Sequence, residues 1–123
     1  GIDVETDRTL PEDAAEYVLA VPERERLAQL PGGMARWALP AFAAKECVHK
    51  CVHPLSGAFL EFEEVAIHFE FDADADADAD ADQAARFVVE ALSVKAKIAL
   101  AGLQWRGELR RQDGLLFSLL AGR

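Results

Sequence analysis

Residues 34–52, MARWALPAFAAKECVHKCV, form the longest stretch of the chain in which apolar side chains recur at helical spacing. Such a stripe predicts a helix with one buried face. Pro40 lies inside the stretch, so the helix either begins there or bends there. The sequence Pro54-Leu55-Ser56-Gly57 predicts its end. The side chains of the stripe are Trp37, Ala41, Ala44, Cys47, Val48 and Cys51.

The segment before this helix predicts one strand and two shorter helices. Gly1 to Glu5 alternates apolar and acidic residues, which is the period of a strand. Thr9-Leu10-Pro11-Glu12 has the spacing of a capping box, and a short helix to about Ala20 follows it. Glu23 to Leu30 predicts a second short helix, and Pro31-Gly32-Gly33 marks the break before the long one.

The second half of the chain is typical of strands. Gln112-Asp113-Gly114 is a hairpin signal between the last two of them. We therefore expect an α+β domain, with helices from the first half packed on an antiparallel sheet from the second half. The expected strands are Val65 to Phe71, Arg86 to Ala91, Ala96 to Leu100, Gln104 to Arg111 and Leu115 to Leu120.

Composition narrows the class of protein. With 123 residues and 51% hydrophobic side chains, the chain fits one globular domain, residues 1–123. No apolar run approaches the roughly 18 residues of a membrane helix, so we expect no membrane partner. The net charge of −9 argues against nucleic acid. Cys47 and Cys51 sit one helical turn apart, where a disulfide would be strained, so we expect a cytoplasmic protein with two free thiols.

An Asp-Ala repeat occupies residues 72–82 and carries six of the acidic side chains. Asp and Ala are both poor strand formers, and six like charges on one face repel each other. We interpret the repeat as a solvated connection between two strands. Calcium binding is the alternative, but the repeat lacks the Gly turn and bidentate Glu of an EF-hand loop.

The first candidate site is the strand at the start of the chain. Strand alternation places Asp3 and Glu5 on one face, roughly 7 Å apart along the backbone. Two carboxylates at that separation can share a hard cation, because such ions prefer oxygen ligands. The alternative is a pair of acidic side chains that only face solvent.

The second candidate site is the segment Phe42 to Lys50 on the long helix. Glu46 and Lys50 are four residues apart and therefore neighbours on one helix face, with Lys45 about 100° round the axis. A carboxylate beside two ammonium groups suits a metal and a diphosphate. The alternative is an ordinary surface salt bridge between Glu46 and Lys50.

The same helix also carries Cys47, His49, Cys51 and His53, which resemble a set of zinc ligands. On a helix, however, the two cysteines point one way and the two histidines point about 200° round the axis. They cannot converge on one tetrahedral ion, so we do not expect zinc.

Together the two candidate sites resemble a known family. Two motifs carry the resemblance: Gly-Ile-Asp-Val-Glu and, about forty residues later, Trp/Phe-x-x-Lys-Glu-x-x-x-Lys. This pattern is similar to the 4′-phosphopantetheinyl transferase superfamily, above all its surfactin- and enterobactin-synthetase type. Pro22-Glu23-Arg24-Glu25-Arg26 resembles the stretch that the family carries between these motifs. The resemblance implies one lobe of a pseudo-two-fold fold, with the N-terminal lobe absent from this sequence.

The resemblance also implies a reaction and roles for five residues. The reaction moves 4′-phosphopantetheine from coenzyme A to a serine of an apo acyl or peptidyl carrier protein. Asp3, Glu5 and Glu46 would hold Mg²⁺, or Mn²⁺, on the coenzyme A diphosphate, and Glu46 would also help to deprotonate the serine. Lys45 and Lys50 would contact phosphates, and Lys50 would assist the leaving group.

Two kinds of partner follow from the same resemblance. A second lobe or subunit would complete the coenzyme A site, and a carrier protein would dock on a local basic patch. The candidates for that patch are Arg24, Arg26 and Arg36, which lie between the motifs. Two other hypotheses remain open: a lobe that binds coenzyme A or a carrier without turnover, and an α+β structural domain in which both motifs are coincidental.

Overall fold

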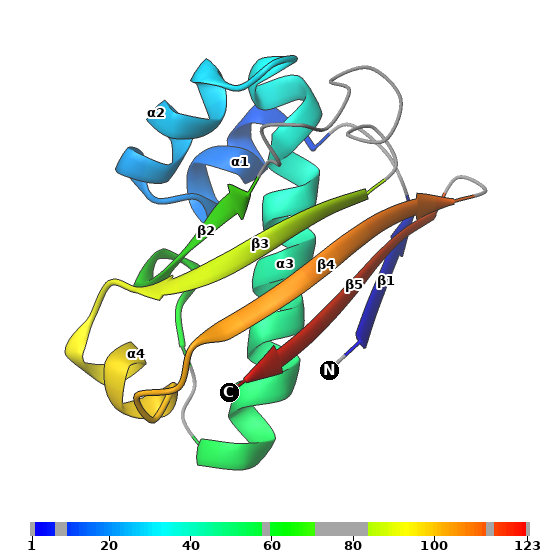
Figure 1. Cartoon of the computed structure of the whole chain (residues 1–123). Helices are drawn as coiled ribbons and strands as arrows, with labels where there is room; N and C mark the ends of the chain where they lie inside the picture. The colour runs from blue at the N-terminus through cyan, green and yellow to red at the C-terminus, as the bar shows by residue number, and fades with distance from the viewer. Residues whose placement is uncertain (1, 7–9, 58–59, 71–83, 113–114, 123) are drawn as a thin grey trace.

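The computed structural model describes residues 2–6, 10–57, 60–70, 84–112 and 115–122. Within these residues the chain forms two layers: an antiparallel sheet, and helices packed on one of its faces (Figure 1). The expected α+β class is therefore confirmed. The Asp-Ala repeat, residues 72–82, which we expected to be a solvated connection, lies outside the described residues.

The sheet has the strand order β1-β5-β4-β3-β2, and every neighbouring pair is antiparallel. Strands β2 to β5 form a meander, and β1 from the start of the chain closes the order by pairing with β5. Gln112 pairs with Leu115, so the expected hairpin between β4 and β5 is confirmed. The strands are β1 (Ile2–Thr6), β2 (Val65–Glu70), β3 (Ala84–Ala91), β4 (Trp105–Gln112) and β5 (Leu115–Gly122).

The helical layer is organised around one long helix, α3, which lies across the sheet (Figure 1). Helices α1 and α2 pack beside its first half, and a short 3₁₀ turn, η1, leads into β2. Helix α4 lies in the connection between β3 and β4. The helical segments are α1 (Glu12–Val18), α2 (Val21–Gln29), α3 (Gly33–Ser56), η1 (Phe62–Glu64) and α4 (Val94–Ala99).

The apolar stripe of α3 forms the centre of the core, as the sequence predicts. All of its members are buried except Cys51, which is half-buried. They belong to one cluster with Phe87, Leu109 and Leu116 of the sheet. Each large apolar side chain buried there contributes roughly 1.5–3 kcal/mol. This packing offsets the cost of about 3 kcal/mol for a proline inside a helix, so α3 continues through Pro40 from its start at Gly33.

The end of α3 also follows the sequence prediction. Gly57 has a left-handed backbone (φ 71°), and its N–H donates to the carbonyl of His53 at 2.8 Å. A residue with a Cβ adopts that conformation at a cost, whereas glycine does so freely.

One predicted strand is wrong: Ala96 to Leu100 belongs largely to helix α4. The segment Val-Lys-Ala-Lys-Ile-Ala alternates apolar and charged residues, which imitates the period of a strand. In the structure Ser93 caps a helix instead, because its hydroxyl accepts a hydrogen bond from the Ala96 N–H at 3.0 Å. Ala96 and Ala99 then face the core, while Val94 and Ile98 are 72% and 74% exposed.

Candidate metal and phosphate site on α3 and β1

Glu46 and Lys50 lie one turn apart on the side of α3 turned away from its buried stripe. Helix α3 is continuous through both residues, so they share one face. Glu46 is half-buried and Lys50 is exposed. The helix therefore presents a carboxylate and an ammonium group on the same accessible face.

Strand β1 contributes the other two candidate ligands through its register with β5. Asp3 pairs with Ser118 and Glu5 with Leu116, and both β5 residues are buried on the face that packs against α3. The side chains of Asp3 and Glu5 lie outside what the structure describes. Their convergence with Glu46 on one ion therefore stays a prediction.

Ser118 links this register to α3. Its carbonyl accepts a hydrogen bond from the Cys47 thiol at 3.8 Å, and Cys47 is the residue after Glu46. Its own hydroxyl is buried and has no hydrogen-bond partner among the described residues. A buried hydroxyl without a hydrogen-bond partner is costly. A polar residue at sequence position 3 in β1, which pairs with Ser118 in the sheet, therefore suits this place. The three acidic residues offer only oxygen ligands, which fit Mg²⁺ or Mn²⁺ rather than zinc.

Lys45 does not occupy the position that a phosphate contact requires. Its side chain is fully buried, with the ammonium group ion-paired to Glu23 at 2.5 Å. The same group donates to the carbonyls of Val18 at 2.8 Å and Phe62 at 2.9 Å. Three acceptors use its three N–H bonds. This arrangement contradicts the expected phosphate contact of Lys45, because no donor remains and no solvent reaches it.

The buried pair of Glu23 and Lys45 instead connects three elements. Glu23 lies in the first turn of α2, Lys45 in α3, and the second carboxylate oxygen of Glu23 accepts from the Ile67 N–H of β2 at 2.5 Å. Burial lowers the pKa of Lys45, and the attraction of the Glu23 carboxylate opposes that shift. The pair is therefore part of the scaffold behind Glu46.

The three arginines expected to dock a carrier have different surroundings. Arg26 reaches β2, where its guanidinium lies 2.7 Å from Nδ1 of His68. The Arg36 guanidinium lies over the ring of Trp37, 5.2 Å from its centroid. Arg24 is half-buried, and its Nε has no hydrogen-bond partner among the described residues.

The cysteines and histidines of α3 do not form a metal centre. Cys47 is buried, whereas both ring nitrogens of His49 lie 2.6 Å from backbone carbonyls, those of Lys45 and Leu60. In the part of the chain that the structure describes, no three His, Cys, Asp or Glu side chains are grouped to hold a metal ion. The side chains of Asp3 and Glu5 lie outside that described part.

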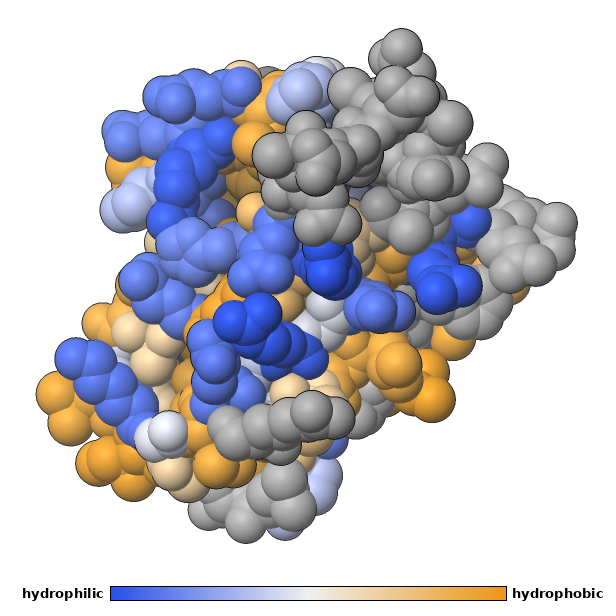
Figure 2. Space-filling view, in the orientation of Figure 1, coloured by the Kyte–Doolittle hydropathy of each residue, from blue (hydrophilic) through white to orange (hydrophobic). Residues whose placement is uncertain are grey.

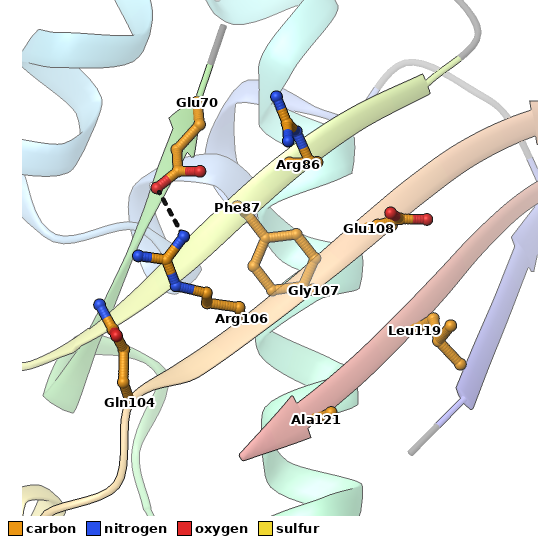
Figure 3. Close-up of a pocket in the computed structure, with 9 residues that line it drawn as sticks. All are labelled: Glu70, Arg86, Phe87, Gln104, Arg106, Gly107, Glu108, Leu119 and Ala121. Carbon is orange, nitrogen blue, oxygen red and sulfur yellow. Dashed lines mark hydrogen bonds and ion pairs between the residues drawn. The ribbon is translucent and has the colours of Figure 1, made fainter. Parts of the chain in front are cut away.

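A hollow of about 540 Å³ lies on the opposite, outer face of the sheet (Figure 3). Its charges are mixed: Arg86 and Arg106 stand beside Glu70 and Glu108, and Arg106 is paired with Glu70 at 3.5 Å. At its other end lies Leu119 of β5. The hollow offers no group of acids for a metal, so we place the candidate site on α3 and β1.

Sequence reasoning missed two residues, Glu23 and Ser118. A glutamate in the first turn of a helix is usually a surface residue that favours the helix dipole, so nothing in the sequence marked Glu23 as buried. Ser118 gave a usable signal: it is a polar residue at an inward position of the otherwise apolar strand LLFSLLAG.

Comparison with known protein families identifies the class of protein to which this fold and site belong. The family model of the 4′-phosphopantetheinyl transferase superfamily matches residues 1–101, which include β1 and all of α3. The chain belongs to this superfamily.

Among individual proteins, the chain is similar to the 4′-phosphopantetheinyl transferase Npt of Nocardia iowensis. The two are 41% identical over 70 residues, which make up 57% of this chain and 31% of that protein. The chain thus spans about a third of the length of this relative. Within the described residues, no helix is long and apolar enough to cross a membrane.

Proposed function

We propose that this chain is the lobe that carries the metal-binding acids of a 4′-phosphopantetheinyl transferase. The protein transfers 4′-phosphopantetheine from coenzyme A to a serine of an apo acyl or peptidyl carrier protein. One observation carries the proposal: the superfamily match includes β1 and α3, and α3 presents Glu46 and Lys50 together on an accessible face.

The residues of this chain would act on the attacking serine and on the leaving group. The serine oxygen attacks the β-phosphorus of coenzyme A, and the bond to 3′,5′-ADP breaks. Glu46 would accept the proton of the serine, and Lys50 would offset negative charge on the phosphate oxygens and on the leaving group. Lys50 acts without Lys45, whose ammonium group is buried.

Asp3, Glu5 and Glu46 would hold Mg²⁺, or Mn²⁺, against the diphosphate. When bound, the ion supplies positive charge that stabilises the phosphoryl oxygens. Ser118 would orient the acid at position 3, because its buried hydroxyl lies opposite that position in the register.

A second lobe or subunit would complete the coenzyme A site. The chain spans about a third of the length of its relative. The outer face of β1 and β5 exposes a group of apolar side chains: Ile2, Val4, Leu115 and Leu119, which are 67%, 48%, 37% and 51% exposed. Contiguous apolar surface of this kind is typical of an interface.

Replacing Glu46 by Gln tests the proposed function. The change keeps the shape of the side chain. It removes one negative charge from the metal site, and it also removes the general base that would accept the proton of the serine. Transfer of labelled phosphopantetheine from coenzyme A to an apo carrier, with Mg²⁺ present, should fall by more than the roughly 10²–10⁴-fold that loss of a general base alone causes.

Glu108→Gln is the matched control, because Glu108 is an exposed glutamate of β4 on the outer face of the sheet. Near-normal turnover by the Glu46→Gln protein would show that Glu46 and Lys50 are a surface pair and would contradict the proposal. A wild-type protein that binds coenzyme A or a carrier but transfers nothing would support the alternative, a non-catalytic binding lobe.

A further inference from the structure

His49 lies on α3 between Glu46 and Lys50, and the proposed reaction gives it no role. Its Nδ1 lies 2.6 Å from the carbonyl oxygen of Lys45, and its Nε2 lies 2.6 Å from that of Leu60. A carbonyl oxygen only accepts hydrogen bonds, so each ring nitrogen must donate one. A neutral imidazole has one N–H, whereas an imidazolium has two. The geometry therefore requires the charged ring, because a neutral ring would set a nitrogen lone pair against a carbonyl oxygen.

The ring is held in place by the segment that follows α3. The chain turns back after this helix, and the segment that leads into β2 runs beside it (Figure 1). The His49 ring is half-buried, and its centroid lies 5.0 Å from that of the Phe62 ring. The Phe62 carbonyl also accepts a hydrogen bond from the buried ammonium group of Lys45 at 2.9 Å. Two cationic side chains of α3 thus hold this segment, and of the two types only histidine ordinarily changes its charge near neutral pH.

The charged ring lies on the same side of α3 as the candidate site. His49 follows Glu46 by three residues and precedes Lys50 by one. At 100° per residue, the three side chains leave the helix within about 100° of one another. The Lys45 carbonyl that His49 holds belongs to the peptide bond that leads into Glu46. His49 therefore fixes the backbone before Glu46 and adds a positive charge to the accessible face.

We propose that His49 is the second cation of the phosphate site and the residue that positions Glu46. The sequence pattern predicted that Lys45 and Lys50 would flank Glu46, but Lys45 is buried. The imidazolium supplies the missing charge. Carbonyls use both of its N–H groups, so it attracts the diphosphate without donating a hydrogen bond to it. The inference rests on the proposed function, since it takes the coenzyme A diphosphate as the ligand of this face.

The proposal has a defined pH dependence. When His49 loses a proton, the site loses one positive charge and one of the two carbonyls loses its donor. The affinity for coenzyme A is therefore present in full at low pH and falls as the pH rises through the titration of the ring. A cation that does not titrate at this position leaves every other ionisable group in place, so comparison with it isolates His49. The other ionisable groups on this side of α3 and on the returning segment are Lys45, Glu46, Lys50, His53, Glu61 and Glu63.

Three variants of the full-length protein separate charge from structure. His49→Gln keeps a polar side chain but cannot become charged. His49→Arg carries a positive charge and several N–H donors at every pH. His53→Gln is the matched control, because His53 is an exposed histidine one turn further along the same helix. Circular dichroism and thermal unfolding establish that each variant folds.

Two measurements from about pH 6 to about pH 9 cover the ordinary titration range of histidine. The Kd for coenzyme A with Mg²⁺ is measured by calorimetry, and ¹⁵N spectra of histidine-labelled wild type count the protons on each ring. Both His49 nitrogens should carry protons where coenzyme A binds most tightly, and loss of one should coincide with weaker binding. His49→Gln should raise the Kd at the low end of the range by about fivefold or more, as removal of one nearby charge does. His49→Arg should stay within about twofold of the tightest wild-type value across the range, and His53→Gln should follow wild type.

A His49 ring with only one protonated nitrogen across the whole range would overturn the inference. So would a Kd for His49→Gln within twofold of wild type at every pH, or a Kd for His49→Arg as weak as that for His49→Gln. Wild-type protein that binds coenzyme A but transfers nothing to apo acyl or peptidyl carrier domains would contradict the proposed function, while the Kd values would still decide the role of His49. Wild-type protein that does not bind coenzyme A would overturn both.

Discussion

Lys45 and Lys50 are five residues apart on one helix, yet the fold gives them opposite surroundings. Five residues correspond to about 140° around a helix axis, so one lysine can point inward while the other points outward. Lys45 is enclosed by Glu23 and two backbone carbonyls, and Lys50 is exposed on the face of Glu46. A sequence pattern of two lysines beside a glutamate therefore contains one structural cation and one candidate phosphate ligand.

Replacing Lys50 by Ala should impair coenzyme A binding strongly, because no neighbouring lysine of α3 can replace it. We expect the KM for coenzyme A to rise by about tenfold or more, corresponding to the loss of roughly one charge-assisted hydrogen bond. Steady-state transfer assays at varied coenzyme A measure this. The unfolding midpoint should stay near wild type, since Lys50 is exposed. An unchanged KM would remove Lys50 from the phosphate site.

Replacing Lys45 by Met should act on stability first. It leaves the Glu23 carboxylate buried without its cation, which typically costs about 3–5 kcal/mol. The double variant with Glu23→Gln should recover part of that loss, because no buried charge is left uncompensated. Urea unfolding of the two single variants and the double variant measures the coupling. A Lys45→Met protein as stable as wild type would show that the buried pair contributes nothing.

At the scale of elements, Glu64 ties the 3₁₀ turn η1 to helix α4. Its carboxylate accepts from the Glu61 N–H at 2.7 Å and from the Ser93 hydroxyl at 2.8 Å, and it lies 3.5 Å from the ammonium group of Lys95. Ser93 is also the cap of α4. The hydrogen bond from the Glu61 backbone, followed by that from Ser93, holds the pKa of Glu64 below its usual value.

This lowered pKa gives a pH-dependent prediction. A carboxyl whose pKa is lower in the folded state stabilises the fold above its unfolded pKa, and the contribution is lost as the pH falls through the folded pKa. The difference in unfolding free energy between wild type and Glu64→Gln should therefore be constant near neutral pH and should shrink below about pH 4.5. Urea unfolding from pH 7 to pH 3.5 measures it. A difference that does not depend on pH would contradict the assigned role.

At the scale of the whole molecule, the two faces of the sheet differ. The inner face is covered by α3, whereas the outer face carries a hydrophilic band over β3 and β4 and a hydrophobic area over β5 and β1 (Figure 2). The residues of that area are Ile2, Val4, Leu115 and Leu119. This asymmetry supports a second lobe or subunit on the β1 and β5 side.

Produced alone, residues 1–123 should self-associate through this apolar area. The double change Leu115→Asp and Leu119→Asp should shift the chain toward monomer, because it places charge on the contact surface. Sedimentation velocity at several concentrations measures the effect, with Arg110→Asp on the polar part of the same face as the control. A wild-type chain that stays monomeric at high concentration would count against a covering lobe.

The sequence by itself determined the elements whose signals are local. The apolar stripe from Trp37 to Cys51 specified the long helix and its buried face, and alternation specified most of the strands. Gln112-Asp113-Gly114 specified the pairing of β4 with β5. Glu46 and Lys50 share a face because helix geometry alone places residues four apart together.

Only the tertiary structure decided the features that depend on distant parts of the chain. Whether Lys45 is buried depends on Glu23, Val18 and Phe62, which come from other elements. Residues 96–99 became part of helix α4 because Ser93 caps it and the core accepts Ala96 and Ala99, although the local alternation favoured a strand. Whether both ring nitrogens of His49 meet carbonyls depends on Leu60, which follows the end of α3. Local periodicity fixes which face of an element is apolar, but only packing fixes what that face meets.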